Sequence, residues 1–92
     1  MIVGDSIRIW VKFRDESNDL YDPDTVTVKY RHIDGALQTF TYPADEVVKD
    51  GTGEYHCLVS LNMAGQWFYH WEGTGSQSAV SEGKFSVEAA LL

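Results

Sequence analysis

The sequence predicts an all-β protein, an antiparallel β-sandwich of about seven short strands. Three observations lead to this prediction. Apolar and polar residues alternate in one segment after another, which is the period of a strand with one buried face. Clusters of Gly, Asp, Asn, Ser and Pro separate these segments and favour turns. No comparable apolar pattern has the period of an amphipathic helix.

Six segments carry the alternation most clearly. In chain order they are residues 6–13 (SIRIWVKF), 25–32 (TVTVKYRH), 37–42 (LQTFTY), 53–61 (GEYHCLVSL), 66–72 (QWFYHWE) and 82–88 (EGKFSVE). Turns are expected in DESNDLYDPD, IDGA, PADEVVKDG, KDGTG, NMAG and GTGSQS. Cys57, the only cysteine, excludes an internal disulfide and is predicted to be a small core residue.

Length and charge limit the classes of function. Ninety-two residues suffice for one domain, residues 1–92, with a single core. A formal charge of −7 repels phosphate backbones and anionic lipid surfaces, so neither nucleic acid nor a membrane is an expected partner. Met1 is followed by no signal-peptide pattern, and we expect a soluble product made in a cytoplasm.

The run WFYHW places five ring side chains in succession. Successive side chains of a strand point to opposite faces, so this run cannot form one platform. The prediction places Trp67, Tyr69 and Trp71 in the core and Phe68 and His70 on the surface. The assignment follows from energy, because an aromatic side chain buries about 150–250 Å², and three rings left in water would forfeit much of a small domain's stability.

The acidic segment DESNDLYDPD has two interpretations. Its carboxylates are hard oxygen ligands of the kind that calcium prefers, although the EF-hand spacing and its glycine are missing. The other interpretation is a solvated loop with a turn at Asp22-Pro23-Asp24. The candidate calcium ligands are Asp15, Glu16, Asp19, Asp22 and Asp24.

Motifs of catalysis and cofactor binding are missing from the sequence. His32, His56 and His70 belong to three different predicted strands and have no short metal-binding spacing. There is no GxSxG motif, and the glycine pairs do not open a predicted helix that would hold a phosphate. We therefore predict no catalytic residue, no cofactor and no metal, and a protein that is not an enzyme.

The segments GDSIRIWVKFRDESNDLYDPDTVTVKYRHIDG, DGTGEYHCLVSL, AGQWFYHWEGTG and SEGKFSV resemble the short immunoglobulin-like proteins encoded among the virion genes of tailed bacteriophages. The resemblance covers nearly the whole chain. It implies an immunoglobulin-like antiparallel β-sandwich without catalytic residues, serving as a head decoration, connector or tail-associated module. It supplies no individual binding residues.

An immunoglobulin-like strand order places exposed aromatic and basic side chains together on both outer sheet surfaces. One predicted patch comprises Phe68, His70, Lys29 and Arg31. The other comprises Trp10, Leu58, Arg8, Lys12 and His56. Aromatic and arginine side chains are frequent anchors of protein interfaces, so both patches are candidate interfaces. The apolar tail with Leu91 and Leu92 is either a frayed end or a segment that docks on a neighbouring subunit.

The resemblance, taken together with these residue patterns, implies a structural protein of a tailed-phage virion, a capsid decoration or head-tail protein made in the host cytoplasm. Its expected partners are major capsid, connector or tail subunits. Association with further copies of itself is a second expectation. The alternative is a carbohydrate- or receptor-binding fibre or adhesin module, in which Trp10 or Phe68 stacks on a sugar. A sugar site needs coplanar exposed rings flanked by amides or carboxylates, whereas an interface needs a contiguous apolar patch with complementary charge.

Overall fold

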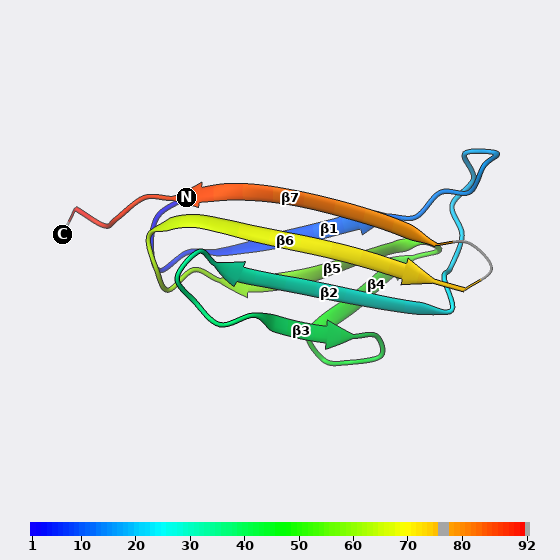
Figure 1. Ribbon diagram of the computed structural model, residues 1–92, viewed down its shortest axis with the longest axis horizontal. Coiled ribbons are helices and arrows are strands. Elements are labelled where there is room, and N and C mark those ends of the chain that lie inside the picture. Colours follow the sequence, from blue (N-terminus) through cyan, green and yellow to red (C-terminus); the bar gives the residue numbers. More distant parts are fainter. Residues whose placement is uncertain (76–77, 92) are drawn as a thin grey trace.

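Seven strands in two antiparallel sheets make up the computed structural model of this chain, which describes residues 1–75 and 78–91 (Figure 1). The strands are β1 (Ser6–Lys12), β2 (Thr25–His32), β3 (Gln38–Thr41), β4 (Val47–Gly51), β5 (Glu54–Ser60), β6 (Gly65–Thr74) and β7 (Ala79–Val87). The predicted all-β class is confirmed. The described ranges contain no helix, and therefore none that is long and apolar enough to cross a membrane.

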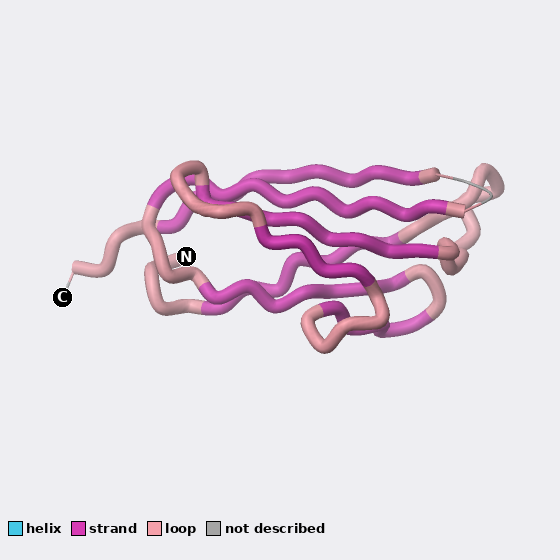
Figure 2. The backbone as a smooth tube through the Cα atoms, turned by 60° about the horizontal axis from the view of Figure 1, so that its bottom comes forward, coloured by secondary structure: helices cyan, strands magenta, loops and turns pink. Residues whose placement is uncertain are grey.

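The sheets lie against each other as the two layers of a sandwich (Figure 2). One has the order β1-β5-β4 and the other the order β3-β2-β6-β7. The chain crosses between sheets after β1, β3 and β5, which is a Greek-key pattern of connections. When β1 is matched to strand B of the immunoglobulin fold, the orders become B-E-D and C′-C-F-G. The predicted immunoglobulin-like sandwich is therefore confirmed.

The core lies between the sheets and is built from the inward positions of the alternating segments. Its buried apolar residues are Ile9, Val11, Phe13, Val26, Val28, Val47, Tyr55, Cys57, Val59, Leu61, Trp67, Trp71 and Val87. Trp71 has no exposed surface at all, and Cys57 lies in the core as predicted. Burial raises the pKa of the Cys57 thiol to about 11, so this thiol stays protonated at neutral pH.

Tyr69 points inward with the two tryptophans but is only half-buried. It lies opposite Gly83 in the pairing of β6 with β7. A Cβ atom on Gly83 would overlap the Tyr69 hydroxyl oxygen, so the missing side chain leaves the space that the phenol occupies. The glycine within this strand is thus explained by close packing.

The segment before β1 ties together the ends of strands from both sheets. The Gly4 amide donates to the Leu61 carbonyl at the end of β5, with an N–O distance of 2.8 Å. The Val3 amide donates to the carbonyl of Glu88, just beyond β7, and the Glu88 amide donates to the Met1 carbonyl. This connection closes one end of the sandwich.

The sequence missed one strand and misjudged the ends of two others. The sequence pattern predicts turns where β4 lies, because only Val47 of this edge strand is buried and its residues show no apolar–polar alternation. Strand β6 continues to Thr74, into the predicted turn GTGSQS (residues 73–78), and β7 begins at Ala79, directly after this turn and before the predicted segment 82–88. Pairing between Gly73 and Ala79 extends the hairpin there, and part of that predicted turn lies outside the described residues.

Candidate functional site

The outer face of the three-stranded sheet carries two large apolar side chains that the fold leaves exposed to water. Trp10 on β1 is 60% exposed and Leu58 on β5 is 61% exposed. The register places Arg8 opposite Leu58 and Trp10 opposite His56, and His56 in turn opposite Val48 of β4. We call this surface the Trp10 face, with outward residues Arg8, Trp10, Lys12, Val48, His56 and Leu58.

Two of the charged or titratable side chains of the Trp10 face make contacts within the protein. His56 Nδ1 lies 2.7 Å from an Asp50 carboxylate oxygen. Lys12 Nζ lies 5.7 Å from the centre of the Trp10 ring, a cation–π contact. Within the described part of the chain, neither Arg8 nor Lys12 belongs to an ion pair. The face therefore presents apolar surface together with two available cations.

The outer face of the four-stranded sheet has a different character. Phe68 is half-buried beneath Arg31, whose guanidinium carbon lies 5.4 Å from the ring centre. His70 Nδ1 lies 2.9 Å from a Glu82 carboxylate oxygen. Lys29 stands opposite His70 on β2. We call this surface the Phe68 face; its phenyl ring lies beneath a guanidinium group and its histidine is paired with a carboxylate.

The structure brings the predicted interface residues together in the two expected groups, on opposite sides of the sandwich. Arg8, Trp10, Lys12 and Leu58 share the Trp10 face, and Arg31, Phe68 and His70 share the Phe68 face. Leu91 belongs to neither, because it lies in the tail beyond β7 and is 97% exposed. Leu92 lies outside the described residues. Whether these residues bind a partner stays a prediction.

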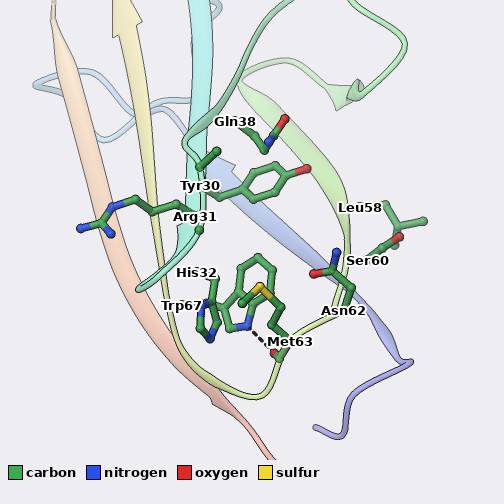
Figure 3. Close-up of a pocket in the computed structure, with 11 residues that line it drawn as sticks. Tyr30, Arg31, His32, Gln38, Leu58, Ser60, Asn62, Met63 and Trp67 are labelled. Atoms are coloured by element: carbon green, nitrogen blue, oxygen red, sulfur yellow. Dashed lines mark hydrogen bonds between the residues drawn. The ribbon is translucent and has the colours of Figure 1, made fainter.

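A groove at the open edge between the sheets was not foreseen (Figure 3). Tyr30 and Trp67 line its inner side, and Gln38, Ser60 and Asn62 line its rim. Its volume is about 320 Å³. No sequence pattern predicts the groove, because the groove depends on where β3 and β4 end along the strands beside them.

The inner side of the groove is held in place by His32. The Asp34 amide donates to His32 Nδ1 over 3.1 Å, so His32 Nε2 carries the proton and donates to the Ala64 carbonyl over 2.7 Å. The imidazole meets Trp67 edge to face, with ring centres 5.4 Å apart. The Trp67 indole N–H donates to the Met63 carbonyl. His32 is thus a packed structural residue.

Carboxylates of the acidic segment bond to the protein itself. Asp15 Oδ1 accepts from the amides of Ser17 and Asp19. Asp22 Oδ1 accepts from the Gly53 amide at 2.7 Å, and Asp22 Oδ2 accepts from Lys49 Nζ at 2.9 Å. In residues 1–75 and 78–91, no three His, Cys, Asp or Glu residues group so as to hold a metal ion. Of the two interpretations, the structure favours a loop that stabilises itself.

Asp22 makes the stability of the fold depend on pH. The hydrogen bonds from Lys49 and from the Gly53 amide hold the pKa of this carboxyl below its usual value. A lowered pKa means stability that is present above about pH 4 and lost as pH falls through the folded-state pKa. We expect the melting temperature of Asp22→Asn to change less between pH 5 and pH 3 than that of the wild type, measured by circular dichroism.

The control for this prediction is Glu16→Gln, which removes an exposed carboxylate of the same segment. Glu16 makes no hydrogen bond to another described residue. The melting temperature of Glu16→Gln should change between pH 5 and pH 3 as much as that of the wild type. Parallel profiles for the wild type and Asp22→Asn would contradict the role of Asp22.

Comparison with family models, with curated proteins and with solved structures finds no match to this chain. The resemblance to phage virion proteins therefore stays a prediction, and the surfaces have to be interpreted from their own chemistry.

Proposed function

We propose that this chain is a non-enzymatic binding module that docks onto another protein through the Trp10 face. The observation that carries the proposal is the adjacent exposure of Trp10 and Leu58, each about three-fifths open to water in a domain whose other tryptophans are buried. Exposed apolar area of this kind is costly to solubility and typical of contact sites. The cations Arg8 and Lys12 beside it suit a partner that presents carboxylates.

The same geometry argues against sugar binding on this face. A stacking platform needs coplanar free rings, but the Lys12 ammonium lies over the Trp10 ring and Phe68 is on the opposite sheet. In the groove, Trp67 is only 5% exposed, so its ring offers no face to a sugar. A protein partner accounts better for Trp10 together with Leu58 and Val48.

The kind of partner follows from the sequence resemblance. A subunit of a tailed-phage virion, in the capsid, the connector or the tail, is the partner that we propose, and assembly would take place in the host cytoplasm. An acidic module with an apolar docking face fits attachment to a preassembled particle.

The test is binding of purified variants to particles of a phage that carries the gene. We expect Trp10→Asp to weaken binding by about 2 kcal/mol or more, roughly thirtyfold in affinity, because a buried interface anchor is lost. Both Trp10→Asp and Phe68→Asp should keep the wild-type circular dichroism spectrum, since both side chains lie outside the core.

Phe68→Asp on the opposite sheet serves as the matched variant and should bind nearly as well as the wild type. Weakened binding by Phe68→Asp alone would move the interface to the Phe68 face. Absence of the protein from particles by mass spectrometry, in a phage that expresses the gene, would refute the virion partner.

A further inference from the structure

Half of one edge of β5 has no neighbouring strand. On one side β5 pairs with β1 along its whole length, from Glu54 to Ser60. On the other side β4 pairs only as far as Val47, which lies opposite Cys57. The segment 58–60 therefore has an open edge, and this edge forms one side of the groove lined by Tyr30 and Trp67 (Figure 3).

The backbone groups on that edge point into the groove. The Phe13 amide donates to the Gly53 carbonyl at one end of the β1–β5 ladder, and the Leu61 amide donates to the Asp5 carbonyl at the other. Backbone bonding in an antiparallel strand alternates sides, so odd-numbered residues of β5 bond to β1. The amides and carbonyls of Leu58 and Ser60 thus face away from β1, and no main-chain partner meets them in the described residues.

The size and lining of the groove suit the binding of one additional β-strand. Its volume of about 320 Å³ lies at the lower end of the range of ligand sites, about 300–1,000 Å³. An inward side chain of an added strand would pack on Tyr30 and Met63, which line the groove. Burial raises the pKa of the Tyr30 phenol, which stays neutral there. An extended peptide with a small or aliphatic inward side chain fits this surface.

The chain carries such a segment outside the sandwich. Beyond Glu88 the residues Ala89, Ala90 and Leu91 are exposed, and no hydrogen bond joins them to the rest of the described chain. They extend away from the end of β7 (Figures 1 and 2). Val87 pairs with Gly65, next to the loop with Asn62 and Met63 that lines the groove, so the tail and the groove lie at the same end.

We propose that the groove receives the Ala89–Leu91 segment of a second copy of this chain, which adds to the open edge of β5 as a short strand. Three extended residues span about 10 Å, enough to pair with residues 58–60. Strand addition supplies backbone hydrogen bonds, and Leu91 supplies the apolar side chain for the groove. A two-fold arrangement end to end allows both tails to exchange. This inference is independent of the Trp10 face proposal.

The experiment is sedimentation equilibrium on the full chain over a concentration series. We expect the wild type to show a mass above the 10.4 kDa of one chain, rising with concentration. Leu91→Asp should raise the dissociation constant about tenfold or more. Ser60→Pro removes the edge amide that faces the groove without touching a β1–β5 bond, and it should have the same effect.

Val80→Asp is the matched control, because Val80 is a 60% exposed apolar residue on the outer face of β7. It should associate like the wild type. A second measurement uses the synthetic peptide SVEAALL, added to the Leu91→Asp variant and followed by NMR. Amide shifts at Leu58 and Ser60 are expected. A monomer at all concentrations, unchanged association of Leu91→Asp, or no shifts at β5 would each overturn the proposal.

Discussion

Replacement of Trp71 by Asp is expected to leave no folded protein. Trp71 is fully buried, and its indole N–H has no hydrogen-bond partner within the described residues, so apolar packing alone holds it. Loss of such a ring costs about 3–5 kcal/mol, and a carboxylate in its place adds several more. A domain of this size is stable by only about 5–15 kcal/mol. Circular dichroism and a thermal melt should show an unfolded chain.

The neighbouring residue supplies the control. Phe68→Asp changes an adjacent ring of the same strand, but its side chain lies on the outer face beside Arg31. Its melting temperature should stay within a few degrees of the wild type, since surface substitutions usually change stability by about 0.5 kcal/mol or less. A folded Trp71→Asp beside an unfolded Phe68→Asp would mean that the two faces of β6 had been interchanged.

Gly53→Ala is expected to have the second largest effect. Gly53 has a φ of +70°, and a Cβ atom there would stand 2.7 Å from the Tyr21 carbonyl oxygen and 2.9 Å from that of Phe13. Both obstacles are backbone atoms, which a rotamer change cannot remove. Left-handed strain costs about 1–3 kcal/mol and the overlap about as much. We expect a fall in melting temperature of more than about 10 °C in a thermal melt.

Gly51→Ala, two residues earlier in the same hairpin, is the matched control for Gly53→Ala. A Cβ atom on Gly51 would meet only a Glu54 carboxylate oxygen at 3.6 Å, which is ordinary contact. Its melting temperature should stay close to that of the wild type. Equal losses from the two substitutions would show that hairpin entropy, rather than the crowding of Gly53, accounts for the effect.

The alternation of side chains was enough to predict the faces of the strands. Trp67, Trp71 and Cys57 are buried and Trp10 and Leu58 are exposed, because period two fixes the side of the sheet on which each lies. The composition of the two outer patches followed once an immunoglobulin-like order was assumed. Neighbouring strands then determined which side chains meet.

Features that depend on contacts between distant segments could not be predicted. The groove exists because the pairing of β4 with β5 ends at Cys57, and no residue of β5 indicates where that pairing ends. The sequence makes Asp22 a candidate calcium ligand, whereas its carboxylate accepts hydrogen bonds from Lys49 and Gly53, about thirty residues further along the chain. Such partners become visible only when the pairing of the sheets is known.

The order of the sheets also bears on how the chain folds during synthesis. Among the described strands β1 has only β5 as a ladder partner, and β2 pairs with β6. Both matches join segments far apart in the chain: Lys12 pairs with Glu54, and His32 pairs with Trp67. Only the hairpins β2–β3, β4–β5 and β6–β7 can form locally. In a nascent chain the backbone of β1 therefore lacks its partner strand, and its apolar side chains stay exposed, until β5 has left the ribosome. Non-local pairing of this kind is slow and leaves strands open to aggregation, so chaperone binding should concentrate on nascent chains that end before residue 60.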